Sequence, residues 1–150
     1  MATEKQKLGY FGEKLVSNLC ACPKCKRHST LKLLPPNFKC ADMICDFCGY
    51  LCQVKTKNVK STDVIPKQIL GAAWAPQKER MDAAIYFPLF LILVNENNNK
   101  DIAVYYLSAD LQDADIFKVR KKLSEKAKRA GWQGYYYDLS EAQNRMVRLF

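Results

Sequence analysis

Apolar side chains near the N-terminus recur every three or four positions along the chain. This spacing places them on one face of a helix, and we therefore expect a helix over residues 5–19. The apolar positions are Leu8, Phe11, Leu15, Val16 and Leu19.

Two further helices are expected later in the chain. Pro66 suits a first helical turn, and the run LGAAWA at 70–75 offers small side chains that let a helix pack closely on a sheet. Pro76 must then kink or restart that helix. A strongly basic helix is predicted over 115–130 and should end at Gly131. Its apolar face comprises Ile116, Val119, Leu123 and Ala127.

The other apolar runs are short and bounded by turn residues, which is typical of strands. The run FPLFLILV at 87–94 is continuous rather than alternating, so it predicts a strand buried on both faces. The turn ENNNKD then makes 102–107 its hairpin partner. In the last strand, the tyrosines at 135–137 alternate between faces, so at least one should be buried. Further strands are expected at 31–34, 38–44, 50–59 and 134–139, and the tail EAQNRMVRLF receives no assignment.

The size and composition fit one α/β domain spanning residues 1–150, with a mixed central sheet flanked by helices. The longest apolar run, 85–94, is too short to span a bilayer, and the charged N-terminus lacks a secretory signal. These features predict a soluble cytoplasmic protein. The formal charge of +9 falls to about +7 if four thiolates bind one zinc ion. Such a surplus favours a polyanionic partner, although it also fits simple solubility.

The seven cysteines all lie between residues 20 and 52. An odd number without an export signal argues against a disulfide framework. Cys22-x2-Cys25 precedes Cys45-x2-Cys48 by nineteen residues, the spacing of a closed, structural four-cysteine zinc site. We expect Cys20, Cys40 and Cys52 to act as core hydrophobes, and His28 to lie on the surface, although it could replace a ligand.

The second Cys-x-x-Cys lies between Asp42 and the pair Gln53 and Lys55. If residues 45–48 form a turn, the hairpin brings position 42 near position 53, and the zinc fixes that register. Gln53 and Lys55 then share one face, while Val54 points into the core; Phe38, Cys40 and Asp42 likewise share a face. Oxygen ligands suit magnesium, and a nearby lysine suits phosphodiester hydrolysis. The alternative interpretation is exposed polar residues without a catalytic role.

The segments CPKC at 22–25, FKCADMICDFCGYLCQVKTKN at 38–58, LGAAWA at 70–75 and LSEKAKRAGWQGYYYDLS at 123–140 together resemble a known family. They look like the PD-(D/E)xK nuclease superfamily and, more closely, the catalytic domain of DpnI-like restriction endonucleases, which are related to the Dam-replacing proteins. The resemblance implies a magnesium-dependent DNA endonuclease that leaves a 5′-phosphate, with methyl direction as a weaker implication. It implies that Asp42 binds magnesium with Gln53, that Lys55 is the catalytic lysine, and that Glu13 supplies an extra acidic group.

Two departures from the family pattern stand out. Gln53 stands where the family usually has Glu, so manganese could replace magnesium, or the site could be inactive. The winged-helix domain that follows the catalytic domain in DpnI-like enzymes is not expected in this sequence. Two alternatives follow: a zinc-containing DNA-binding module on an inactivated scaffold, and a subunit that needs a partner or a homodimer to cut both strands.

Several basic and aromatic residues are candidates for contact with double-stranded DNA. Lys57 and Lys60 continue the strand past the proposed site, and Arg129 and Trp132 belong to the family-like RAGWQG. With Lys128 they form the predicted DNA contacts, and the alternative is a solvated helix face.

Overall fold

The computed structural model describes residues 2–150. It contains two α-helices, α1 (Glu4–Leu19) and α2 (Trp74–Asp82), within that range. Neither of these helices is long and apolar enough to span a membrane. The strands are β1 (Leu31–Leu33), β2 (Met43–Cys45), β3 (Leu51–Val59), β4 (Gln68–Ala73), β5 (Leu89–Asn95), β6 (Asn98–Leu107), β7 (Phe117–Val119), β8 (Gly134–Asp138) and β9 (Val147–Arg148). Short 3-10 turns cover Ala109–Leu111, Ala114–Ile116 and Gln143–Arg145.

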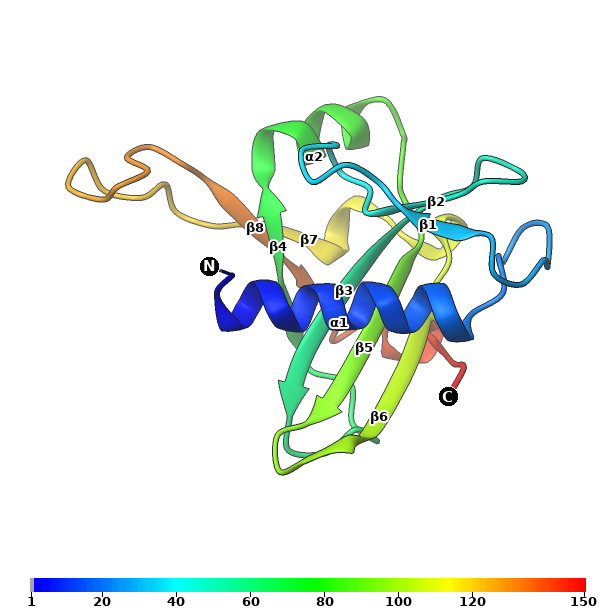
Figure 1. Ribbon diagram of the computed structural model, residues 1–150. Helices are drawn as coiled ribbons and strands as arrows, with labels where there is room; N and C mark the ends of the chain where they lie inside the picture. The colour runs from blue at the N-terminus through cyan, green and yellow to red at the C-terminus, as the bar shows by residue number, and fades with distance from the viewer. Residues whose placement is uncertain (1) are drawn as a thin grey trace.

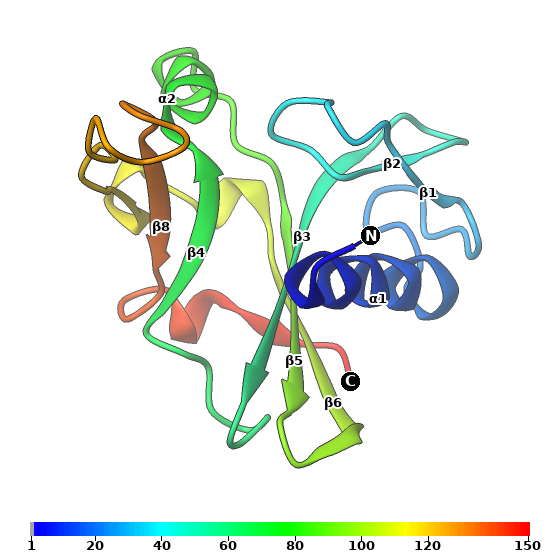
Figure 2. The ribbon, with the colours of Figure 1, turned by 60° about the vertical axis from the view of Figure 1, so that its left-hand side comes forward.

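The strands form two sheets. The larger has the order β1-β2-β3-β5-β6-β9, with β3 and β5 parallel and the other pairs antiparallel, so the predicted mixed sheet is confirmed. Helix α1 crosses one face of β3, β5 and β6 (Figure 1). The antiparallel sheet β4-β8-β7 lies on the other side of these strands, where the sequence predicted helices (Figure 2).

Strand β5 is buried on both faces because each face meets a different layer. Leu89, Leu91 and Leu93 pack toward the smaller sheet, in a core with Tyr135 and Tyr137. Phe90, Ile92 and Val94 pack toward α1, in a second core that also holds Val16 and the zinc-type cysteines Cys22 and Cys45. The continuous apolar run therefore stabilises two cores at once, each buried aliphatic side chain contributing about 1.5–3 kcal/mol.

The prediction of a helix from near residue 66 is wrong for the first part of that segment. Residues 68–73 form β4, which pairs with β8 in the register Ile69↔Tyr137, and the helix α2 starts only at Trp74. A Cβ on Gly71 would lie 2.3 Å from the Tyr135 ring, so the small residues here admit an aromatic ring rather than a helix–sheet contact. Pro76 lies in the first turn of α2, where a missing N–H costs little.

The basic helix predicted over 115–130 is also wrong. Residues 114–116 form a 3-10 turn, β7 follows, and 120–133 is a loop. Pairing of β7 with β8 buries Phe117 at 5.1 Å from the Tyr137 ring, a contact that a helix would lose. Of the predicted apolar face, Ile116 is buried, but Val119 and Leu123 are exposed and Ala127 is half-buried. Gly131, with φ +75°, belongs to a turn in this loop.

The strand predicted over 38–44 is shorter than expected. Only Met43–Cys45 joins the sheet, because the chain leaves the extended conformation at Cys40, whose φ is +68°. Phe38 and Cys40 therefore do not share a strand face with Asp42. The strands expected at 31–34, 50–59, 87–94 and 134–139 are confirmed with small shifts at their ends. The strand expected at 102–107 is confirmed too, but it begins at Asn98, inside the segment ENNNKD that was predicted as a turn.

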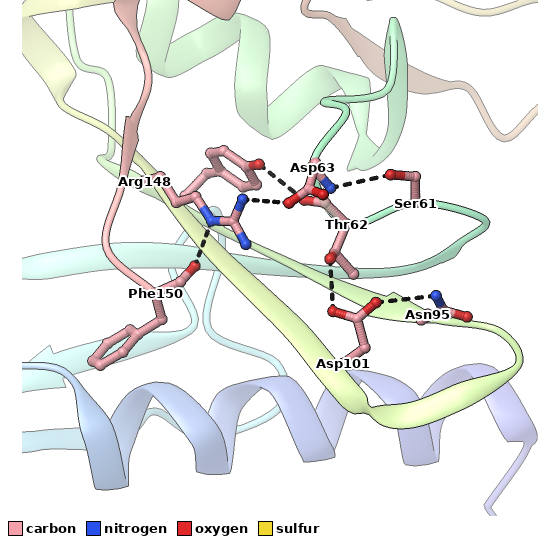
Figure 3. A network of polar contacts seen from close by, with 8 residues as sticks. Ser61, Thr62, Asp63, Asn95, Asp101, Arg148 and Phe150 are labelled. Carbon is pink, nitrogen blue, oxygen red and sulfur yellow. Dashed lines mark hydrogen bonds and ion pairs between the residues drawn. The ribbon is translucent and has the colours of Figure 1, made fainter.

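The C-terminal tail forms one edge of the larger sheet. β9 pairs with β6, and Arg148 donates to the Asp63 carboxylate at 2.7 Å and to the Phe150 carbonyl at 2.9 Å (Figure 3). Beside it, Asp101 accepts hydrogen bonds from Thr62 and Asn95 (Figure 3). This network joins the tail to the 61–63 loop, which follows the C-terminal end of β3, whereas Gln53 and Lys55 lie near the start of that strand.

Candidate metal centre and active site

Four cysteine sulfurs converge beside α1. The Sγ atoms of Cys22, Cys25, Cys45 and Cys48 all lie within 4.8 Å of one another. Cys22 and Cys48 are 3.6 Å apart, and Cys25 and Cys45 are 3.7 Å apart. A tetrahedral zinc ion with Zn–S bonds of about 2.3 Å requires sulfurs about 3.8 Å apart. The four residues therefore fit a closed zinc centre, which would be structural.

The two knuckle turns have the backbone that such a centre needs. Lys26 donates to the Cys22 carbonyl at 2.9 Å and adopts φ +66°, and Gly49 donates to the Cys45 carbonyl at 2.9 Å with φ +79°. Gly49 accepts this left-handed conformation without the strain of a Cβ. The Cys45 sulfur also lies 3.2 Å from the Thr30 hydroxyl, which holds it in place.

The remaining cysteines and His28 lie outside this cluster. Cys20 and Cys52 are buried, as expected for core hydrophobes, and burial raises the pKa of the Cys20 thiol to about 11. Cys40 differs from that expectation because it is only half-buried and lies in the bend before Asp42. His28 is exposed, as expected.

The hairpin holds Asp42 against β3, as the sequence predicted. β2 and β3 pair in the register Met43↔Cys52, so residue 42 faces residue 53. The Asp42 amide donates to the Cys52 carbonyl at 2.9 Å, and the Val54 amide donates to Oδ2 of Asp42 at 2.8 Å. One carboxylate oxygen is thereby anchored, and Asp42 keeps a fixed position next to a cleft.

Glu13 approaches Asp42 from helix α1. Both residues line one cleft of about 730 Å³ that runs between α1 and the Pro35-Pro36 turn. Burial, and then the charge of Asp42, raise the pKa of Glu13, while Lys55 lowers it. Burial lowers the pKa of Lys55, and Asp42 and Glu13 oppose that shift. The three groups are therefore electrostatic neighbours, although they come from three separate elements.

Lys55 does not line that cleft but a separate pocket of about 390 Å³ between α1 and β4. Lys5 and Lys57 line it as well, and none of its lining residues is acidic. This concentration of positive charge beside the carboxylates suits a phosphate-bearing ligand.

Gln53 shares a face with Lys55 but is held from both ends. It is 6% exposed; Tyr137 donates to its Oε1, and its Nε2 donates to the Cys40 carbonyl at 2.6 Å. The Tyr137 and Tyr135 hydroxyls are 3.3 Å apart, and Tyr135 donates to Gln77 on α2 at 3.3 Å. The alternation of the tyrosines indicated their burial, but nothing in the sequence linked them to Gln53 or Gln77.

The predicted DNA contacts fall into two separate groups. Lys57 and Lys60 are exposed on and just after the C-terminal half of β3. Lys128, Arg129 and Trp132 lie in the loop between β7 and β8, and the Arg129 guanidinium stacks 4.4 Å above the Trp132 ring. In both ribbon views the end of β3 and this loop lie apart (Figures 1 and 2).

These features define a mixed α/β protein with a four-cysteine cluster that could hold a metal ion and a cleft lined by Glu13 and Asp42. The family model of DpnI, the Dam-replacing family, matches residues 1–147, and the chain belongs to this family. The search of curated proteins found no match. Membership in the family points to a nuclease related to restriction systems.

Proposed function

We propose that the protein is a metal-dependent DNA endonuclease of restriction type, with a PD-(D/E)xK fold in a single domain. The observation that carries this proposal is that Asp42 and Glu13 line one cleft, while Lys55 on β3 lines a separate pocket and is the electrostatic neighbour of both carboxylates. Family membership supports the same activity and supports DNA as the substrate.

Asp42 and Glu13 would hold a magnesium ion, since hard cations prefer carboxylate oxygens and both residues face the cleft. When bound, such an ion polarises a phosphate and lowers the pKa of a water ligand. The Asp42 carboxylate is already oriented by the Val54 amide, so little reorganisation is needed to bind a cation. Lys55 would orient the attacking water or stabilise the negative charge that develops on the phosphate.

Gln53 would contribute its amide oxygen, which has a second lone pair beside the one that accepts from Tyr137. Its amide is neutral, so we expect weaker magnesium binding than with a carboxylate, and manganese as an effective substitute. The four cysteines would bind one zinc ion and keep the β2–β3 hairpin in register.

The second candidate is a zinc-containing DNA-binding module without catalysis. The burial of Gln53 between two protein partners favours it, because a residue in the usual ligand position is then used as a structural bridge. Exposed basic residues support DNA binding under either candidate; Lys57, Lys60, Lys128 and Arg129 are among them, with Trp132 adjacent.

The test is cleavage of supercoiled plasmid, adenine-methylated and unmethylated, with magnesium, manganese or chelator. The proposed function predicts metal-dependent nicking or linearisation with 5′-phosphate ends, and a difference between the plasmids would indicate methyl direction. The ratio of nicked to linear product, followed against protein concentration, would show whether a homodimer is needed. DNA binding in chelator without cleavage in either metal would support the binding module.

A further inference from the structure

We infer that residues 120–133, between β7 and β8, form an arm that enters the major groove of the DNA substrate. The inference rests on the proposed function, because it specifies how that substrate is held. The arm extends away from the two sheets (Figure 1).

The arm is a narrow, internally bonded ribbon rather than a loose loop. The Arg120 amide donates to the Gly134 carbonyl at 2.9 Å, and the Leu123 amide donates to the Trp132 carbonyl at 2.8 Å. The Gln133 side chain donates to the Arg120 carbonyl at 2.9 Å. The two sides of the arm therefore stay paired beyond the ends of β7 and β8.

The tip of the arm is closed by its own backbone. The Ala127 amide donates to the Ser124 carbonyl at 3.0 Å, and the Gly131 amide donates to the Leu123 carbonyl at 3.0 Å. These bonds give the tip a defined shape before any ligand binds, and this lowers the ordering cost of binding.

Trp132 fixes the direction of the arm at its base. A Cβ on Gly134 would lie 2.6 Å from the Trp132 ring, so the indole packs directly on the β8 backbone. Arg129 stacks on the same indole, with its guanidinium 4.4 Å from the ring centroid. Trp132 is thus a positioning residue that aims Arg129, rather than the main DNA contact.

The charge of the arm fits a polyanion. Six cations are exposed along it, and Glu125 is its one acidic residue. None of the six makes an ion pair within residues 2–150. The cations are Arg120, Lys121, Lys122, Lys126, Lys128 and Arg129.

The shape of the arm selects the groove. The major groove is about 12 Å wide and admits a two-stranded ribbon, whereas the minor groove is about 6 Å wide. The backbones of two paired strands are about 4.8 Å apart, and the side chains add to this width. A ribbon of that width is too wide for the minor groove but fits the major groove. Arginine pairs with the O6 and N7 atoms of guanine there, so Arg129 is placed to read bases.

The experiment is an interference assay with DNA methylated sparsely by dimethyl sulfate, which marks guanine N7 in the major groove and adenine N3 in the minor groove. The probe is a plasmid fragment that the wild-type protein binds, and binding is done in chelator so that no cleavage occurs. Three proteins are compared: wild type, Arg129→Gln, and a shortened arm in which residues 122–132 are replaced by Asn-Gly, a favourable two-residue hairpin turn.

The expected result is that guanine N7 methylation excludes DNA from the wild-type complex and that this exclusion disappears with the shortened arm. Arg129→Gln should lose it at one or two guanines and weaken binding on the order of 10-fold. The arm contributes no residue to either core, so the shortened variant should keep its melting temperature and zinc content. If the shortened variant does not fold, the footprint of Arg129→Gln alone tests whether the arm enters the major groove.

Interference confined to adenine N3, or a footprint unchanged in both variants, would overturn the inference. These outcomes are separable from a failure of the proposed function. Absent cleavage with an arm-dependent footprint would refute only the nuclease, and normal cleavage with an arm-independent footprint would refute only the arm.

Discussion

The Tyr137 phenol donates a hydrogen bond to Oε1 of Gln53 and so joins the smaller sheet to the strand that carries Lys55. At its other end, Gln53 donates from Nε2 to the Cys40 carbonyl at 2.6 Å. An amide can accept and donate at once, and an ionised carboxylate can only accept. The two partners therefore give a physical reason for glutamine at this position.

Replacing Gln53 by glutamate should therefore weaken the metal-free protein. The carboxylate would face the Cys40 carbonyl without a proton to donate, so we expect Gln53→Glu to lower the free energy of unfolding by about 1–3 kcal/mol in urea titrations. Added magnesium should restore part of the loss, since the new carboxylate gains a cation.

The matched control is Gln77→Glu, at the other end of the tyrosine chain. Gln77 is equally buried and accepts from Tyr135, and its side-chain nitrogen donates to no protein group within residues 2–150. Both substitutions bury a carboxylate, so the difference between them reports the bond to Cys40. Equal losses in the two variants would contradict this account of Gln53.

Two glycines on α1 should respond to alanine in opposite ways. A Cβ on Gly12 would lie 1.7 Å from the Thr56 hydroxyl, whereas a Cβ on Gly9 would meet nothing within 4 Å. Gly12→Ala must push α1 away from β3 and should destabilise the protein by about 1–3 kcal/mol. Gly9→Ala should stabilise it by about 0.5–1 kcal/mol, through helix propensity alone. Thermal melts of the pair test this, and equal shifts would mean that α1 is not seated on Thr56.

Loss of one zinc ligand should unfold the hairpin that carries Asp42. We expect about one zinc ion per chain in the purified protein and a loss of several kcal/mol of stability in Cys45→Ser. Cys40→Ser is the control, since Cys40 lies outside the sulfur cluster. Metal analysis by mass spectrometry with parallel melts gives the answer, and a Cys45→Ser protein with full zinc would contradict the four-cysteine assignment.

Glu13 should make the stability of the metal-free protein depend on pH. Burial and Asp42 raise its pKa above the ordinary value of 4.5, so the folded chain holds the proton more tightly than the unfolded chain. Stability is therefore lost as pH rises from about 4.5 through the raised folded pKa. Glu13→Gln should melt higher than wild type near neutral pH, and the gap should close in acid. A gap that stays constant from about pH 4 to pH 8 would show that Glu13 titrates normally.

The parts of the fold that the sequence predicted are those fixed by local pattern. Helix α1, the run through Phe90 and Ile92, and the two Cys-x-x-Cys turns each carry their own periodicity or turn residues. The helix prediction for residues 70–75 was wrong because small residues suit both a helix packed on a sheet and a strand covered by tyrosine rings. Only the pairing with β8 decides between the two structures. The helix prediction for residues 115–130 was wrong because it rested on local apolar spacing alone. The burial of Phe117 against Tyr137, a contact between distant parts of the chain, favours a strand instead.

The same division applies to the candidate site. The sequence predicted a hairpin from the order in which Asp42, the second Cys-x-x-Cys, Gln53 and Lys55 follow one another. In the structure the two strands of this hairpin pair so that residue 42 faces residue 53, as predicted. The bonds from Tyr137 and Cys40 to Gln53 come from chain positions 84 and 13 residues away, so no local pattern signals them.

The most direct test of the nuclease is the rate of plasmid cleavage by Asp42→Asn against Asp46→Asn, in magnesium and in manganese. Asp46 lies four residues further on and is exposed in the zinc-type turn, so it changes the same charge away from the cleft. Our account predicts that Asp42→Asn cuts at least about 100-fold more slowly, with its zinc content and DNA binding unchanged, and that Asp46→Asn cuts like the wild type. Equal rates in the two variants, or no cleavage by the wild type in either metal, would contradict it.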